Sequence, residues 1–135
     1  MKTFTAPFAQ TPKTATAVCT AAATVTNDAP TNTVLLLTAG AEGAILTKLT
    51  AMPRATVTAA DLVVFLSKDG GTTKRMIDSK LMSAYTMAAT TATPITAFDY
   101  SESAPLRLEA GDEIYVGSQV ALAGGIVFKA EFTEF

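Results

Sequence analysis

The stretch DLVVFLSKDGGTTKRMI, residues 61–77, decides how this chain folds. Its first seven residues, 61–67, are apolar at both odd and even positions over most of their length. The Asp69-Gly70 pair that follows supplies the positive φ that a tight β-hairpin turn requires. The stretch therefore predicts a strand, a turn over residues 68–73 and a return strand that starts near Lys74.

The strand predicted at 61–67 carries apolar side chains on both of its faces. Successive side chains in a strand point to opposite faces, so Val63 and Phe65 share the face opposite to that of Leu62 and Val64. Such a strand is either central and covered twice, or it gives one face to a contact between subunits. Val63 and Phe65 are therefore our candidate subunit-interface residues.

Short strand-like runs separated by turn residues continue in both directions from this hairpin. Residues 78–105 stay open between strand, helix and loop, because they are rich in small and polar residues without a clear period. The remaining runs give seven to nine short strands and no long helix, which is typical of an all-β antiparallel sandwich of the jelly-roll type over residues 14–135. The other predicted strands are 14–26, with alternating threonine and small apolar residues, 34–38, 45–52, 114–122 and a C-terminal strand around 128–133.

The first 13 residues form a separate feature, which we expect to be an extended N-terminal arm. Two prolines in this segment favour extended backbone. Phe4 and Phe8 are unfavourable in water, and Lys2 and Lys13 make the arm locally basic on an acidic chain. These four residues are our candidate contacts to a partner. The alternative is that the arm folds back onto its own domain.

The composition excludes several classes of function. A chain of 135 residues is one domain by length, and a net charge of −2 does not suit binding to nucleic-acid phosphates. Without histidine, no Ser-His-Asp or Cys-His catalytic arrangement is available. Cys19 is the single cysteine, so it forms no internal disulfide and no thiolate zinc site, and we read it as a small buried residue. No apolar run is long enough to cross a bilayer. We expect no catalytic residue, no cofactor and no metal site.

Three local patterns imitate chemical sites. The sequence KDGG at 68–71 lacks the Gly-Lys-Ser/Thr of a phosphate-binding loop and is better explained by the hairpin. DYSES at 99–103 offers too few oxygen ligands for calcium. The chain has one acidic cluster, formed by Glu109, Asp112 and Glu113. Two carboxylates can catalyse glycoside hydrolysis when they flank a sugar-binding cleft, but acidic residues are also common in a turn between strands.

Three blocks of the sequence resemble a known class of proteins: PTNTVLLLTAGAEGA, VVFLSKDGGTTKRMIDS and PLRLEAGDEIYVGSQVALAGGIVFKAEF. Together they resemble small β-sandwich virion proteins that tailed bacteriophages encode as head or tail accessory proteins. The resemblance covers residues 27–135 and rests on turn and strand patterns. It implies a non-enzymatic capsid decoration (cement) protein, made in the bacterial cytoplasm and incorporated into the virion. The expected partners are copies of the chain itself, as a symmetric homo-oligomer and specifically a trimer, and the major capsid protein or another virion protein.

Two alternatives belong to other classes. The first is a tail- or spike-associated adhesin or receptor-binding module, which usually reads carbohydrate with exposed aromatic side chains. The second is a small lyase or hydrolase, against which the absence of histidine is the main argument.

Overall fold

The computed structural model describes residues 11–135 of the chain. Within this range the chain forms nine β-strands and no helix. The strands are β1 (Thr11–Cys19), β2 (Val34–Thr38), β3 (Ala44–Pro53), β4 (Ala60–Ser67), β5 (Arg75–Met82), β6 (Thr96–Ala97), β7 (Leu106–Leu108), β8 (Glu113–Ser118) and β9 (Ile126–Glu134).

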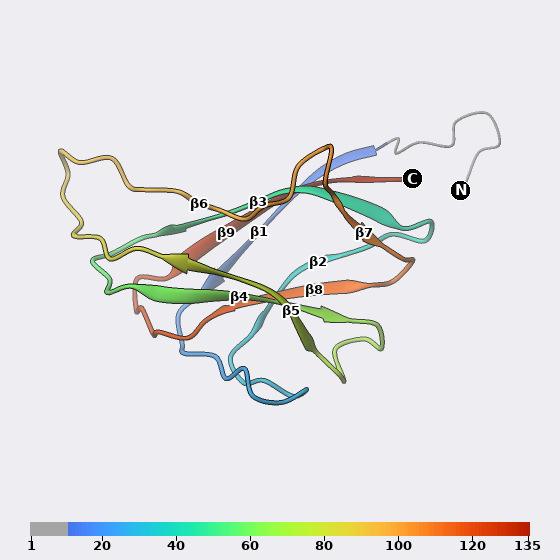
Figure 1. The fold of residues 1–135 in the computed structure, drawn as a ribbon, viewed down its shortest axis with the longest axis horizontal. Helices are drawn as coiled ribbons and strands as arrows, with labels where there is room; N and C mark the ends of the chain where they lie inside the picture. Colours follow the sequence, from blue (N-terminus) through green and yellow to red (C-terminus); the bar gives the residue numbers. More distant parts are fainter. Residues whose placement is uncertain (1–10) are drawn as a thin grey trace.

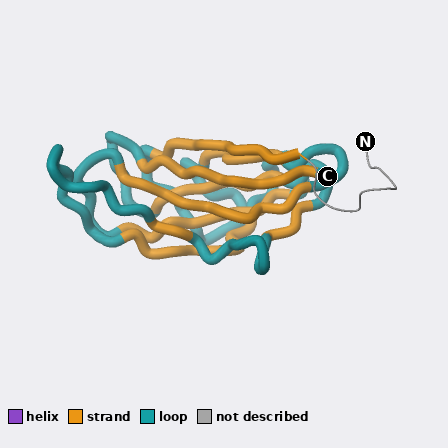
Figure 2. Tube along the Cα trace, turned by 90° about the horizontal axis from the view of Figure 1, so that it is seen from above, coloured by secondary structure: helices purple, strands orange, loops and turns teal. Residues whose placement is uncertain are grey.

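The strands form two antiparallel sheets that pack face to face. One sheet, which we call sheet A, has the order β1-β9-β3-β6, with β7 also paired to β3; the other, sheet B, has the order β2-β8-β4-β5. Both layers are visible in Figure 1, and in Figure 2 the strands run along the molecule with loops gathered at its two ends.

The pairing pattern identifies the topology. β4 pairs with β5, β3 with β6 and β7, β2 with β8, and β1 with β9. These nested pairs are what results when one long antiparallel hairpin is wrapped into two sheets, and the wrapping adds the pairs β3–β9 and β4–β8. The fold is therefore an antiparallel β-sandwich with jelly-roll topology, as the sequence predicted.

The core lies between the two sheets and follows the alternation of each strand. In β9, buried and partly buried side chains alternate from Ile126 onward, so that one face enters the core and the other faces outward. In β4, Leu62 and Val64 belong to the same core as Phe128 and Ile126, and all four are 0% exposed. The hydrophobic effect across this interface is the main source of stability.

Several predicted elements are confirmed. β2 has the predicted bounds, β3 is one residue longer than predicted at each end, and β4 begins one residue earlier than predicted. β5 follows the predicted hairpin closely. In that turn Gly70 and Gly71 have φ values of 74° and 94°, which glycine adopts without strain. Residues 83–105 are mainly loop, with only the short β6 inside them.

Two predicted boundaries are wrong. The strand expected at 14–26 begins at Thr11 and ends at Cys19, because its partner β9 begins at Ile126, opposite Cys19. Residues 11–13, expected in the arm, are thus part of sheet A. The strand expected at 114–122 ends at Ser118, where the side-chain hydroxyl donates to the carbonyl of Val120 at 2.9 Å and the chain turns.

Candidate interaction surfaces

The candidate contacts of the N-terminal arm separate into two groups. Lys2, Phe4 and Phe8 lie outside the described residues. Lys13 lies in β1, and its Nζ atom is 2.8 Å from Oε1 of Glu134 at the end of β9. The Lys13 side chain is 48% exposed and that of Glu134 is 13% exposed. Lys13 therefore forms an ion pair at the edge of the sandwich, and about half of its side chain remains exposed to water.

The candidate subunit-interface residues Val63 and Phe65 are buried by the chain itself. Both are 0% exposed, and both lie on the outer face of β4, away from the core that holds Leu62 and Val64. A residue that one chain buries completely offers no area to a second copy. The strand is instead covered twice by its own chain, which was the other explanation of its apolar pattern.

The cover over this outer face comes from the segment between β1 and β2. The N–H of Ala23 donates to the carbonyl of Ser118 at 2.8 Å, which fixes the segment to the end of β8. A Cβ atom built on Gly117 of β8 would lie 2.9 Å from Cβ of Ala23 and 3.5 Å from Cγ2 of Val63. Residues 20–33, which we call the covering segment, thus rest directly on β8 and β4, and Gly117 leaves the room that this contact needs.

A second contact ties the covering segment to the β4–β5 hairpin. The backbone N–H of Lys74 donates to the carbonyl of Asp28 at 2.8 Å, and its Nζ atom donates to Oγ1 of Thr33 at 3.2 Å. The same ammonium group stands 4.3 Å from the centre of the Tyr115 ring, a cation–π geometry. Lys74 therefore closes the outer face of sheet B next to Phe65, which pairs with Tyr115 in the sheet.

Exposed apolar side chains remain at the free edge of sheet B. In β5, Met76 is 48% exposed, Ile77 is 40% exposed and Leu81 is 64% exposed. Ile95, just before β6, is 61% exposed, and it lines a small cavity together with Leu81. Edge strands usually avoid such residues, because unpaired backbone and apolar side chains invite other strands. The sequence analysis did not identify this surface, although the segment RMIDSKLM contains its apolar residues.

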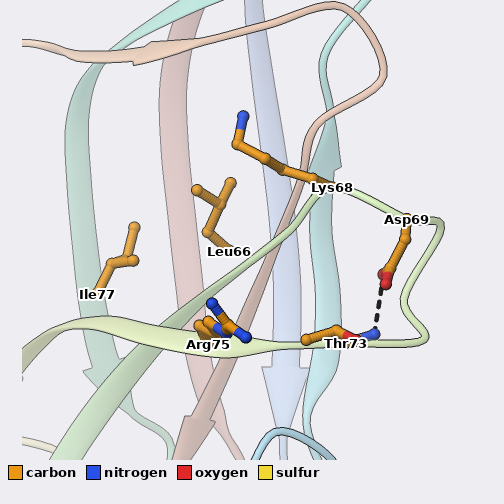
Figure 3. Close-up of a pocket in the computed structure, with 6 residues that line it drawn as sticks. All are labelled: Leu66, Lys68, Asp69, Thr73, Arg75 and Ile77. Atoms are coloured by element: carbon orange, nitrogen blue, oxygen red, sulfur yellow. Dashed lines mark hydrogen bonds between the residues drawn. The ribbon is translucent and has the colours of Figure 1, made fainter.

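A pocket lies beside the same hairpin (Figure 3). It has a volume of about 440 Å³ and is lined by Leu66, Lys68, Asp69, Thr73, Arg75 and Ile77. Its floor is apolar, and its two cations already face acids: Lys68 Nζ is 2.9 Å from Oδ2 of Asp112, and Arg75 Nη2 is 3.5 Å from Oδ2 of Asp28.

The two remaining polar residues of the pocket wall, Asp69 and Thr73, belong to the turn. Oδ1 of Asp69 accepts the Thr73 N–H at 2.8 Å, the contact drawn in Figure 3, and this bond lowers the carboxyl pKa. Asp69 also accepts the Ser67 hydroxyl at 3.0 Å. The carboxylate thus stabilises the hairpin rather than a ligand.

The acidic residues of the cluster at 109–113 also accept hydrogen bonds from their own chain. Oδ2 of Asp112, which is 4% exposed, accepts the Glu109 N–H at 2.9 Å as well as Lys68 Nζ. That hydrogen bond to Asp112 raises the pKa of Lys68. Glu113 accepts the Tyr115 hydroxyl at 3.2 Å and the Thr38 hydroxyl at 3.4 Å. These contacts hold the β7–β8 turn against its neighbours.

Cys19 is buried, as expected, and burial raises the pKa of its thiol to about 12. Since the thiolate is the reactive form, this cysteine is inert near neutral pH. Among residues 11–135, no group of three or more acidic or cysteine side chains is arranged to hold a metal ion. In the same range, no helix has the length and hydropathy needed to cross a membrane.

Comparisons with known proteins add no relative. No family model matches the sequence, and neither the curated proteins nor the solved structures compared with it give a match.

Proposed function

We propose that this chain is a non-enzymatic structural protein of a bacteriophage virion, most specifically a capsid decoration protein that acts by binding other proteins. The observation that carries the proposal is the exposed apolar edge of sheet B, formed by Met76, Ile77 and Leu81. A rigid sandwich that keeps such an edge open is suited to assembly through strand contacts.

The virion assignment rests on two further supports. The jelly roll is a fold of many viral capsid domains, although it also occurs in lectins and cupins. The three sequence blocks that resemble phage accessory proteins contain β2, β7 and β8 in full and parts of β4, β5 and β9, whereas β1, β6 and nearly all of β3 lie outside them. The partners under this proposal are other copies of the chain, assembled as a trimer, and the capsid surface.

The arm completes the proposed mechanism of attachment. Residues 1–10 precede β1 and carry Lys2, Phe4 and Phe8, so they supply apolar and cationic contacts to an acidic shell. Lys13, at the start of the sandwich, adds a partly exposed charge beside them. Because many copies bind one particle, weak contacts of this kind produce stable occupancy.

Quantitative mass spectrometry of purified particles of the encoding phage or prophage tests the proposal. We expect copies on the order of hundreds per particle, since a decoration protein follows the repeats of the shell. A chain that lacks residues 2–10 should keep its melting temperature and lose occupancy. Absence of the full chain from particles would overturn the proposal, and specific binding of the isolated protein to a glycan array would favour the adhesin instead.

A further inference from the structure

Within residues 11–135, the outer edge of β5 has a backbone N–H that bonds to no other strand. β5 pairs with β4 on one side and is the last strand of sheet B. The N–H of Ser79 donates at 2.8 Å to Oδ1 of Asp78, its own neighbour, at an exposed position. In an antiparallel pair, alternate residues direct their backbone groups away from the partner strand. Ser79 is such a residue, and its N–H is therefore accessible to another strand.

The sequence of β5 is complementary to itself about Ser79. On either side of this serine stand Asp78 and Lys80, and beyond them Ile77 and Leu81. In an antiparallel pair related by a two-fold axis, residues equally distant from the axis lie opposite each other. An axis at Ser79 thus sets an acid against a base twice.

We propose that β5 pairs with β5 of a second copy, antiparallel and about a two-fold axis at Ser79, so that the two B sheets become one continuous sheet. Opposite charges directly across a strand pair stabilise it, and like charges destabilise it. An axis at Lys80 would set two lysines against each other, and an axis at Asp78 would set two aspartates against each other. The Ser79 axis is the register of these three that pairs the charges.

The side chains involved are directed compatibly. Asp78 pairs with Val64 and Lys80 pairs with Leu62, so both lie on the inward face of β5 and meet across the axis on one face. Within the chain, Lys80 contacts the 88% exposed Asp99 at 3.2 Å, and Asp78 faces the hydroxyl of Tyr100. A partner's charges would therefore add to these contacts at the edge. A bulge at Ile77 ends the regular ladder and limits the pairing to about residues 77–81. The contact covers Leu81, the most exposed large apolar residue of β5.

The first test uses Ser79→Cys. Two residues on the axis face each other with Cβ atoms about 4.5–5.5 Å apart, close enough for a disulfide after small adjustments. We expect mild oxidation to convert most of this variant into a covalent dimer at concentrations where the wild type self-associates. Thr16→Cys, on the exposed edge strand β1 of sheet A, is the matched control, and the buried Cys19 does not compete. Cross-linking no faster than in the control would overturn the proposal.

The second test changes the charges of β5 to determine which residues of the two strands lie opposite each other. Lys80→Asp sets acid against acid twice and should weaken self-association about tenfold or more. The double swap D78K/K80D restores both opposite-charge pairs and should recover the wild-type mass in light scattering. If these residues acted only within one chain, neither variant would change the mass in light scattering; that result would overturn the proposal.

The contact goes beyond the proposed virion role, and both tests use the isolated protein. A chain that cross-links at Ser79 but is absent from particles loses only the virion role. A chain that is present on particles but fails both tests loses only the β5 contact.

Discussion

The outer faces of the two sheets differ in polarity and in exposure to water. On sheet A, Thr14, Glu131 and Lys48 form a cross-strand row of polar side chains, and Glu131 lies within ion-pair distance of Lys48 and Lys129. On sheet B, the corresponding face carries Val63 and Phe65, which are 0% exposed under the chain's own cover. One face is solvated and the other is a second, smaller core.

The difference teaches how to interpret a strand that is apolar on both faces. Its outer face buries area, but the covering layer is supplied by residues 20–33 and Lys74 of the same chain rather than by a subunit. What sheet B leaves open is its edge, where Met76 and Leu81 are exposed. The surface that we propose for assembly therefore lies beside the doubly apolar strand and not on it.

The largest effect that this comparison predicts is that of Phe65→Ala. Removal of a fully buried phenylalanine side chain costs about 3–5 kcal/mol of unfolding free energy, because the transfer free energy is lost and a cavity is left. Val127→Ala, on the outer face of β9 and only partly buried, is the matched change on sheet A and should cost less than about 1.5 kcal/mol. Urea unfolding of both variants measures the difference.

A different result for Phe65→Ala would reverse the interpretation of this face. If the variant kept its unfolding free energy but changed its mass in light scattering, Phe65 would be acting between subunits, as the sequence first indicated.

An intermediate effect is expected for Gly117→Val. The new Cβ atom would lie 2.9 Å from that of Ala23, so the covering segment must lift from β8. We expect a loss of about 1–3 kcal/mol, the usual cost of overpacking. Hydrogen exchange should show lost protection of the Ala23 amide, which now donates to Ser118, while β3 and β9 stay protected. Thr16→Val, an exposed change on β1, is the control. Unchanged exchange at Ala23 would mean that the segment does not rest on Gly117.

The fold was largely predictable because its signals are local. Alternation of side chains and the Asp69-Gly70 turn depend on neighbours in the sequence, and they located β2, β3, β4 and the hairpin within a residue or so. The end of β1 was not predictable in this way. Residues 20–26 continue the alternation of threonine and small residues, but they have no partner in β9 and cross over to sheet B, where Ala22 bridges to Ser118.

The candidate surface was less predictable, because burial depends on distant contacts. The sequence does not show that residues 20–33 cover the face of β4 that carries Val63. It also does not show that Gly117 is the position whose missing side chain makes room for this segment. The exposure of Met76 and Leu81 could not be predicted, because the order of strands in the sheet, which makes β5 an edge strand, is not encoded in a local pattern. The self-complementary order around Ser79 was readable, but it acquires meaning only once that edge is known to be unpaired.

The smallest effect belongs to the solvated face, where Glu131→Gln should change the unfolding free energy by less than about 0.5 kcal/mol. Oε2 of Glu131 lies 3.3 Å from Nζ of Lys129 and 3.9 Å from Nζ of Lys48, and all three side chains are 45–56% exposed. Water screens such pairs, and ordering the long side chains offsets much of the attraction. Unfolding at low and high salt measures the effect, which should shrink further as salt rises. A loss of more than about 1 kcal/mol, insensitive to salt, would mean that this row is shielded from water in the folded protein. In that case the outer face of sheet A, and not only the edge of sheet B, would be in contact with another copy.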